Sequence, residues 1–228
     1  MKQSNAFISG SCDSQIIIWS MNPSNQWVYS QKLNGHSNTI NCLILNNNEN
    51  LIISGSDDIS IKFWMKQNKW TCQQTITDHT YWVLGLSMNQ QQNKVISCGQ
   101  DDQILIIEQS LQDSKWIIIQ KIKVERYGRR ICFLNDNLFT FQPYNREQMH
   151  VYEMNNTNKQ YSKIKDVVVK NGDDKYFFPQ QYIKSKCLLV NKHANYVNLI
   201  RTNQNGEFKV EQSIEFKTQY LYGSMSDD

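Results

Sequence analysis

The chain has 228 residues, enough to bury a sizeable core, and its hydrophobic residues (39%) come in short clusters that suit strands better than long helices. Asparagine and glutamine together account for 48 residues and crowd into turn-like tracts, which we interpret as solvated connectors without chemistry. The formal net charge is only +3 with both signs scattered, which argues against a dedicated nucleic-acid-binding surface.

Cysteine usage and the first residues indicate the cellular compartment. Six cysteines are spread along the chain without a CxxC pair, so we expect reduced thiols and no disulfides. The N-terminus lacks a charged-then-apolar leader, and the pure apolar runs are only a few residues long. We therefore expect a cytoplasmic protein, with the nucleus as the alternative, and no insertion into a membrane.

A hairpin-like segment recurs along the chain. It first runs from Phe7 to Trp19 as an apolar strand, a tight turn rich in Gly, Ser and Asp, and a second strand that ends in a bulky side chain. A copy at Ile52–Trp64 begins 45 residues after the first, and a copy at Val95–Ile107 begins 43 residues after the second. Weaker copies occupy Leu138–Tyr152 and Leu188–Ile200. Such a period predicts a repeat protein.

An aromatic residue follows each copy by six to nine residues and opens a further β-rich run. These aromatic residues are Trp27, Trp70, Trp116, Tyr161 and Phe208. Two of the runs end in a histidine, at Gly35-His36 and Asp78-His79, before another apolar strand begins. The repeating unit is therefore four strands in about 45 residues. Radial stacking of such sheets buries both faces of each sheet.

The second copy carries the most specific residues. His36 before the first strand, Ser54 on the second, Asp58 in the turn and Trp64 at the end of the third together resemble a full WD repeat. The resemblance implies that these four side chains form one hydrogen-bonded network. Such a network satisfies a carboxylate that is buried in a turn.

The resemblance to the WD-repeat (WD40) family weakens along the chain. The network residues kept elsewhere are His79, Ser97 and Asp101 in the third copy and Ser9, Asp13 and Trp19 in the first. The fourth and fifth copies keep none, with Gln142 and Val190 at the expected place of the serine. We therefore expect these two copies to depend on apolar packing alone.

The predicted fold is an all-β WD-repeat β-propeller of four-stranded antiparallel blades, with about five blade equivalents. Residues 1–228 are predicted to form a single domain, with clear repeats in 1–110 and degenerate repeats in 111–228. The segment Tyr220–Met225 resembles an innermost strand and could pair with Ala6–Gly10 to close a five-bladed ring. The alternative, which we favour, is that the chain is part of a larger propeller.

No pattern of catalytic or metal-binding residues stands out from the repeat. The four histidines and six cysteines lack metal-ligand spacing, and we expect no cofactor. There is no phosphate-cradling glycine loop and no Ser-His-Asp arrangement. The densest basic stretch, Lys121–Arg130, is expected to be a solvated strand and loop, with contact to phosphates or an acidic peptide as the alternative.

We therefore predict a non-enzymatic scaffold or adaptor that binds other proteins. In a propeller of this family, residues before the turn aspartate and at the start of innermost strands lie on a broad binding face. The positions that match are Cys12, Asn38, Asp57, Tyr81 and Gln100. Tyr81 is an apt anchor because exposed aromatic residues dominate interface energetics.

Three alternatives remain for the function. The segment Trp70-Thr71-Cys72, leading to Asp78-His79, is similar to the cytosolic iron–sulfur assembly WD-repeat adaptors, which hold no cluster themselves. The second alternative is a propeller-based enzyme or small-molecule receptor, because fold alone does not determine function. The third is a truncated paralogue without a function.

Overall fold

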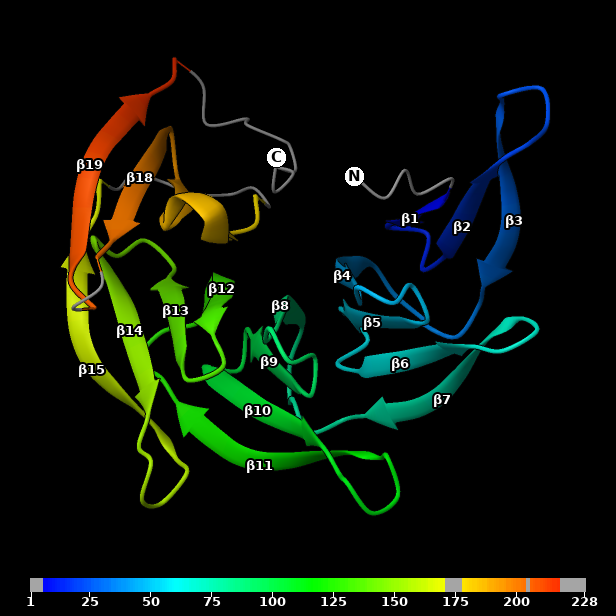
Figure 1. Cartoon of the computed structure of the whole chain (residues 1–228), viewed down its shortest axis with the longest axis horizontal. Coiled ribbons are helices and arrows are strands. Elements are labelled where there is room, and N and C mark those ends of the chain that lie inside the picture. Colours follow the sequence, from blue (N-terminus) through cyan, green and yellow to red (C-terminus); the bar gives the residue numbers. More distant parts are fainter. Residues whose placement is uncertain (1–5, 171–177, 204–205, 218–228) are drawn as a thin grey trace. The chain divides into compact units, whose positions relative to one another are not determined.

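The computed structural model describes residues 6–170, 178–203 and 206–217, which consist mainly of antiparallel strands (Figure 1). In these ranges the helical content is one short 3₁₀ turn, η1 (Lys184–Lys186). The strands form five sheets, of which the first has three strands and the others four. This confirms the predicted all-β fold with about five blade-like sheets.

The strands follow chain order within every sheet. Sheet 1 contains β1 (Ala6–Gly10), β2 (Ile16–Met21) and β3 (Trp27–Leu33). Sheet 2 contains β4 (Ile40–Leu45), β5 (Leu51–Ser56), β6 (Ile61–Lys66) and β7 (Trp70–Ile76). Sheet 3 contains β8 (Val83–Met88), β9 (Lys94–Gly99), β10 (Gln103–Gln109) and β11 (Trp116–Lys123). Sheet 4 contains β12 (Gly128–Asn135), β13 (Leu138–Pro143), β14 (Gln148–Met154) and β15 (Tyr161–Val168). Sheet 5 contains β16 (Gln181–Ile183), β17 (Leu188–His193), β18 (Tyr196–Thr202) and β19 (Phe208–Glu215).

The predicted repeat coincides with these sheets. Each recurring segment is the hairpin formed by the second and third strands of a blade, and each of the five aromatic residues begins the outermost strand. Sheet 1 has the three strands that were expected, without an innermost strand among the described residues. The segment Tyr220–Met225 lies outside the described residues, so the closed ring and the larger propeller both stay predictions.

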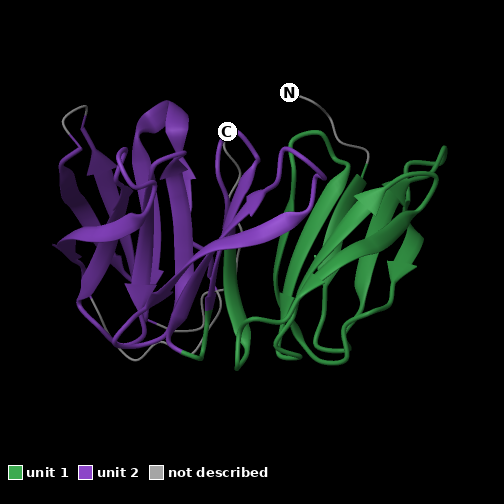
Figure 2. Ribbon diagram, turned by 90° about the horizontal axis from the view of Figure 1, so that it is seen from below, with its two compact units in different colours: residues 1–86, 99–101 green, residues 87–98, 102–228 purple. Residues whose placement is uncertain are grey.

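The chain divides into two compact units (Figure 2). Unit 1 comprises residues 1–86 and 99–101, and unit 2 comprises residues 87–98 and 102–228. Sheets 1 and 2 belong to unit 1, sheets 4 and 5 belong to unit 2, and sheet 3 has residues in both. The single domain expected from the sequence stays a prediction.

Each unit has its own apolar core between neighbouring sheets. In unit 1, Ile16 and Ile18 of sheet 1 pack with Ile52 and Trp64 of sheet 2. In unit 2, one cluster joins isoleucines of β9 and β10 to the phenylalanines of β12 and β13. A second cluster joins Met149 and Val151 of β14 to Leu189 and Ile200 of sheet 5. Alternating apolar residues on the strands supply these faces.

The outermost strand of every sheet carries one extra residue at the same place. The pairing of the last two strands shifts just before Trp19, Trp64, Ile107, Tyr152 and Ile200. Such a shift is a β-bulge, which bends the strand and increases its twist. The bulges mark Tyr152 and Ile200 as the structural counterparts of Trp64.

The residue after each bulge lies four positions beyond the aromatic residue that opens the strand. These residues are Gln31, Gln74, Gln120, Lys165 and Gln212. In unit 1 the Gln31 amide donates to the Trp70 carbonyl oxygen (2.8 Å) and accepts from the Trp70 N–H (2.9 Å). In unit 2 Gln120 makes the same pair of bonds with Tyr161, both 2.8 Å. We call this contact the glutamine bridge, and it ties one outermost strand to the next.

Strand register corrects one assignment from the sequence. Ser54 lies two residues after Ile52, the residue that pairs with Trp64. The same count from the residues that pair with Tyr152 and Ile200 leads to Phe141 in sheet 4 and Asn191 in sheet 5. The predicted Gln142 and Val190 are each wrong by one residue. The error arose because the hairpin turns differ in length: two residues separate the paired strand ends in sheet 5, but five in sheet 2.

Candidate functional site

The four network residues of the second repeat lie together in sheet 2. The imidazole Nδ1 of His36 is 2.7 Å from Asp58 Oδ2, and its Nε2 is 2.6 Å from Ser54 Oγ. The indole N–H of Trp64 donates to the same Ser54 oxygen at 2.9 Å. Ser54 and Trp64 are buried within the sheet, and Ser60 adds a hydroxyl that donates to Asp58 Oδ1 (2.6 Å). Every polar group in this cluster therefore has a partner.

The donors and acceptors are consistent with one proton arrangement. Ser54 accepts from Trp64, so its own hydroxyl hydrogen can be donated to His36 Nε2. His36 then carries its proton on Nδ1 and donates it to Asp58, which is the neutral tautomer. Burial lowers the pKa of His36, although Asp58 opposes this shift. A neutral His36 beside an ionised Asp58 is therefore the ground state.

The turn carboxylate of Asp58 is held in its ionised form. Burial raises its pKa, but hydrogen bonds from the Ser60 hydroxyl, the Ser37 backbone N–H (3.0 Å) and His36 outweigh this effect. The pKa of Asp58 falls to about 2 as a result. The network thus fixes the turn between β5 and β6 through a charged acceptor, the stronger kind of hydrogen bond.

The neighbouring repeats keep parts of this arrangement. His79 Nδ1 lies 3.0 and 2.9 Å from the two carboxylate oxygens of Asp101, and a side chain at Gly99 would meet both groups at 2.6 Å. Ser97 is buried on β9. In sheet 1 the Trp19 indole donates to Ser9 (2.9 Å), whereas Asp13 is exposed and accepts from the Gln15 backbone (3.1 Å). The network is thus most complete in sheet 2.

Two of the candidate binding positions, Asp57 and Gln100, make the same backbone contact. The N–H before the turn aspartate donates to the carbonyl just before an innermost strand: Asp57 to Thr39 (2.9 Å) and Gln100 to Trp82 (2.8 Å). Asn41 also donates to Asp57 Oδ1 (2.6 Å). Asn41 is the extra residue of a bulge between β4 and β5, and bulges re-aim side chains. The turn and the strand entry are therefore fixed to each other.

Two aromatic side chains stand exposed beside these bonds. Tyr81 is 47% exposed and Trp82 37%, with their ring centroids 5.2 Å apart. Cys12 and Asn38 are exposed, and Asp57 and Gln100 are half-buried. The arrangement offers a large amphipathic contact area at a fixed backbone, which suits a protein interface.

The structure also reveals a buried polar cluster in unit 2 that the sequence did not indicate. Thr140 donates to Gln180 (3.0 Å), Asn191 donates to Gln142 (3.0 Å), and Asn198 donates to the Asn191 carbonyl (3.3 Å). All five residues are buried. The expectation that sheets 4 and 5 depend on apolar packing alone is therefore wrong. Amide residues were interpreted as solvated connectors, but in these strands and at Gln180 they are buried and hydrogen-bonded.

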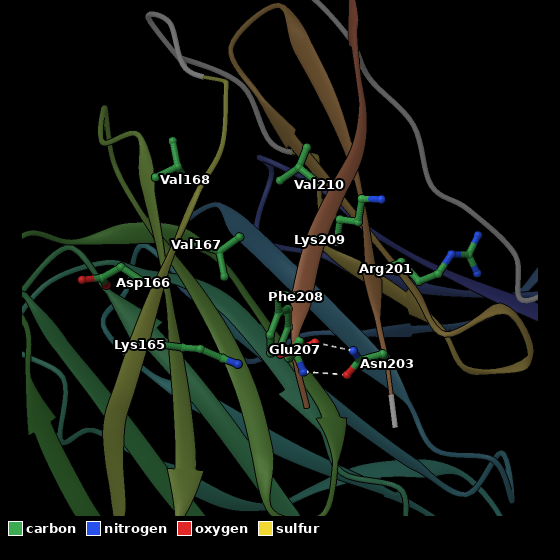
Figure 3. A pocket seen from close by; sticks show the side chains of 10 residues that line it. All are labelled: Lys165, Asp166, Val167, Val168, Arg201, Asn203, Glu207, Phe208, Lys209 and Val210. Atoms are coloured by element: carbon green, nitrogen blue, oxygen red, sulfur yellow. Dashed lines mark hydrogen bonds between the residues drawn. The ribbon is translucent and has the colours of Figure 1, made fainter. Parts of the chain in front are cut away.

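A cavity of about 710 Å³ lies between the outermost strands of sheets 4 and 5 in unit 2 (Figure 3). Val167, Phe208 and Val210 give it an apolar part. Two cations of its lining have partners within the protein: Lys165 lies over the Phe208 ring, and Arg201 binds Glu211 at 2.6 and 3.0 Å. This pairing does not present the convergent polar groups of a catalytic site.

In residues 6–170, 178–203 and 206–217, no group of three or more His, Cys, Asp or Glu side chains is placed to hold a metal ion. All six cysteines lie in these ranges and carry free thiols, and burial raises the pKa of Cys42 to about 12. The same ranges contain no helix that is both long and apolar enough to cross a membrane.

The antiparallel four-stranded sheets and the His–Asp–Ser–Trp network define a WD-type repeat protein. In agreement, residues 22–65 and 70–108 match the family model described as WD domain, G-beta repeat. These two segments of the chain are thus WD40 repeats. A comparison with curated proteins found none that matches, and no finding supports the resemblance to the iron–sulfur assembly adaptors.

Proposed function

We propose that this protein is a non-enzymatic scaffold that binds a partner protein through the exposed turn and strand-entry residues of unit 1. The interaction face comprises Asn38, Asp57, Tyr81, Trp82 and Gln100. The observation that carries the proposal is the exposed Tyr81–Trp82 pair beside two fixed turns. Large aromatic side chains on a rigid backbone bury much area at little entropic cost. The proposal includes a cytoplasmic location, with the nucleus as the alternative.

The interaction face supports a partner of protein size better than a small molecule. Its aromatic side chains and Asn38 are exposed, whereas small-molecule sites are concave and enclose most of their ligand. The polar groups of the turns, Asp58 and Asp101, are used in bonds to His36 and His79. They are therefore committed to holding the turns and not available for proton transfer to a substrate.

Site-specific photo-crosslinking tests this proposal. A photoreactive benzoylphenylalanine is introduced in place of Tyr81, and in a second protein in place of Tyr29, which is 63% exposed on the outermost strand β3. Both variants are expressed in the native cells and irradiated. The expected result is a discrete adduct to one partner protein from position 81 and no such adduct from position 29.

Alanine substitution supplies the second arm of the experiment. Tyr81→Ala with Trp82→Ala should lower the affinity for the partner identified at position 81 by about tenfold or more, because central aromatic residues carry much of the binding energy. Tyr29→Ala should leave it unchanged. Equal adducts from both positions, or an affinity that does not respond to the double substitution, would refute the interaction face.

A further inference from the structure

Two arginines in unit 2 lie over one tyrosine ring. The guanidinium carbons of Arg126 and Arg129 are 5.5 and 5.7 Å from the ring centroid of Tyr144. The ring of Tyr127 stacks on Tyr144 with centroids 5.1 Å apart and an interplanar angle of 13°. Arg126 is exposed and the other three residues are half-buried. We call these four residues the arginine–tyrosine cluster.

The backbone holds this cluster in place. Tyr127 N–H donates to Asp102 Oδ1 (2.6 Å), and the Tyr127 carbonyl accepts from Tyr144 N–H (2.8 Å). Arg129 is the extra residue of a bulge between β12 and β13. Gly128 beside it approaches β13 so closely that a side chain there would meet the Gln142 carbonyl. Bulge and close approach together re-aim Arg129 towards Tyr144.

The cluster takes the same places in its sheet as the interaction face of unit 1. The equivalent backbone bonds run from Asp57 to Thr39, from Gln100 to Trp82 and from Tyr144 to Tyr127. Tyr144 therefore stands before the turn, and Tyr127 just before the innermost strand β12. The bulged Arg129 corresponds to the bulged Asn41 of sheet 2. The strand-entry and turn positions of sheet 4 thus present cations and aromatic rings.

We infer that the arginine–tyrosine cluster binds a phosphoryl group carried by a phosphorylated segment of the partner protein. The inference rests on the proposed function and adds the chemistry of the partner. Guanidinium groups form short, bidentate bonds to phosphate oxygens, and a phosphorylated side chain offers about two negative charges at neutral pH. Two like charges beside one ring repel each other, so a dianion between them is favoured. Tyr144 fixes both guanidinium groups through cation–π contact, which lowers the entropy lost on binding.

A single compact dianion fits better than a polyanion. Exposed Glu125 and Glu147 flank the cluster in the sequence and repel an extended chain of phosphates. The chain as a whole has a formal net charge of only +3. Nucleic acids and anionic membranes draw their affinity from many cationic contacts over a long surface. Their binding is therefore an outcome that the test must distinguish.

Nuclear magnetic resonance titration tests the inference directly. The probe is the peptide acetyl-Gly-phosphoserine-Gly-amide, with its unphosphorylated form and its glutamate form as controls. Signals of the Arg126 and Arg129 side-chain Nε–H groups and of the Tyr127 and Tyr144 rings should shift with the phosphopeptide. The two control peptides should shift them at least about tenfold less at equal concentration, in line with the strength of charge-assisted bonds.

Matched charge-removing variants give the second readout. Arg126→Gln with Arg129→Gln should weaken phosphopeptide binding about tenfold or more, since two charge-assisted contacts are lost. Lys121→Gln with Lys123→Gln removes the same charge from exposed positions in the same basic stretch and should change binding less than twofold. Arg126→Gln alone, at an exposed side chain, replaces the double variant if the latter fails to fold.

Several outcomes overturn the inference. These are an absence of shifts at the cluster, equal loss in the arginine and lysine variants, or tighter binding of a ten-nucleotide single-stranded RNA or of vesicles with 20% phosphatidylserine. Failure of the phosphoryl inference can be distinguished from failure of the proposed function. If Tyr81 crosslinks a partner while the phosphopeptide leaves the cluster unchanged, only the phosphoryl inference fails. If the cluster binds the phosphopeptide while Tyr81 finds no partner, the interaction face fails instead.

Discussion

Ser54 holds the side chains of the second repeat together at a single oxygen. That oxygen accepts from Trp64 at 2.9 Å and lies 2.6 Å from His36, in a place where the serine is fully buried. This network could be predicted because the resemblance of the second repeat to a WD repeat implies it. The added hydroxyl of Ser60, 2.6 Å from Asp58, was not predicted, because the family pattern does not mark it.

Removing the hydroxyl of Ser54 is expected to destabilise the protein by about 2 kcal/mol. The substitution Ser54→Ala leaves a buried indole N–H and a buried imidazole nitrogen without their shared partner, and such groups keep their desolvation cost. Ser9→Ala is the matched control, because Ser9 receives the Trp19 indole in a half-exposed place that water can reach. It should cost below about 1 kcal/mol in urea unfolding. Equal costs for the two variants would contradict the role assigned to the network.

Acid should lower the free energy of unfolding in two steps, because His36 and Asp58 both have lowered pKa values in the folded state. The folded state keeps His36 neutral, whereas the unfolded state takes up a proton near pH 6.5, so stability falls as the pH drops below 6.5. Asp58 adds a second loss as the pH falls from about 3.8 towards 2. Its contribution is fully present above this window.

Urea unfolding at several pH values between 8 and 5 measures the first step. His36→Gln should make stability less dependent on pH in this range, because glutamine does not titrate. Burial also lowers the pKa of His150, whose contribution remains in both proteins and cancels in the comparison. An unchanged pH dependence in His36→Gln would show that His36 is not held neutral.

At the scale of elements, the hairpins and their outermost strands were predictable, whereas the pairing between them was not. Alternating apolar residues and turn residues are local signals, so all five hairpins and all five opening aromatic residues lie where expected. The bulges depend on the exact register between neighbouring strands, and the amide pair depends on a partner far along the chain: Asn191 and Gln142 are 49 residues apart. Register also decides which residue faces the core, which is why Phe141 and Asn191 were missed.

Gly128 provides a test of the close packing at the start of β12. Gly128→Ala should destabilise the protein by about 3 kcal/mol, because its methyl group meets the backbone carbonyl of Gln142, which cannot move aside. Gly206→Ala is the control: its φ of +72° is strained for alanine, but no atom lies within 4 Å, so the cost should be about 1 kcal/mol. Thermal unfolding of both variants measures the difference, and a tolerated Gly128→Ala would rule out the close approach.

At the scale of the whole molecule, two different kinds of buried hydrogen-bond network stabilise the repeats. The histidine–aspartate network fixes the turn of sheet 2, whereas buried amides join the strands of sheets 4 and 5. Both place hydrogen bonds within the core, and each adds directional bonds to apolar packing. The degenerate repeats therefore have specific contacts of their own, although they lack the family pattern.

Hydrogen exchange should follow this distribution of contacts. Amides of β5, β6 and β13 should be the slowest, because these strands are central and their residues are mostly buried. Amides of β1 and β2 should exchange sooner, since sheet 1 leaves Phe7 (43%) and Trp27 (44%) exposed. Mass spectrometry of peptides from 6–33, 51–66 and 138–154 compares them. Protection of β1 equal to that of β5 would contradict this order.

The glutamine bridge has a consequence for the evolution of repeat number. Gln31 and Gln120 bond only to the backbone of the following aromatic position, which is tryptophan in one case and tyrosine in the other. The bond at the joint is therefore indifferent to the side chain it meets, provided that the four-residue spacing is kept. A gene duplication that copies one whole repeat delivers both halves of the joint at once. Arrays of this kind can thus gain or lose units without a new contact having to arise by mutation.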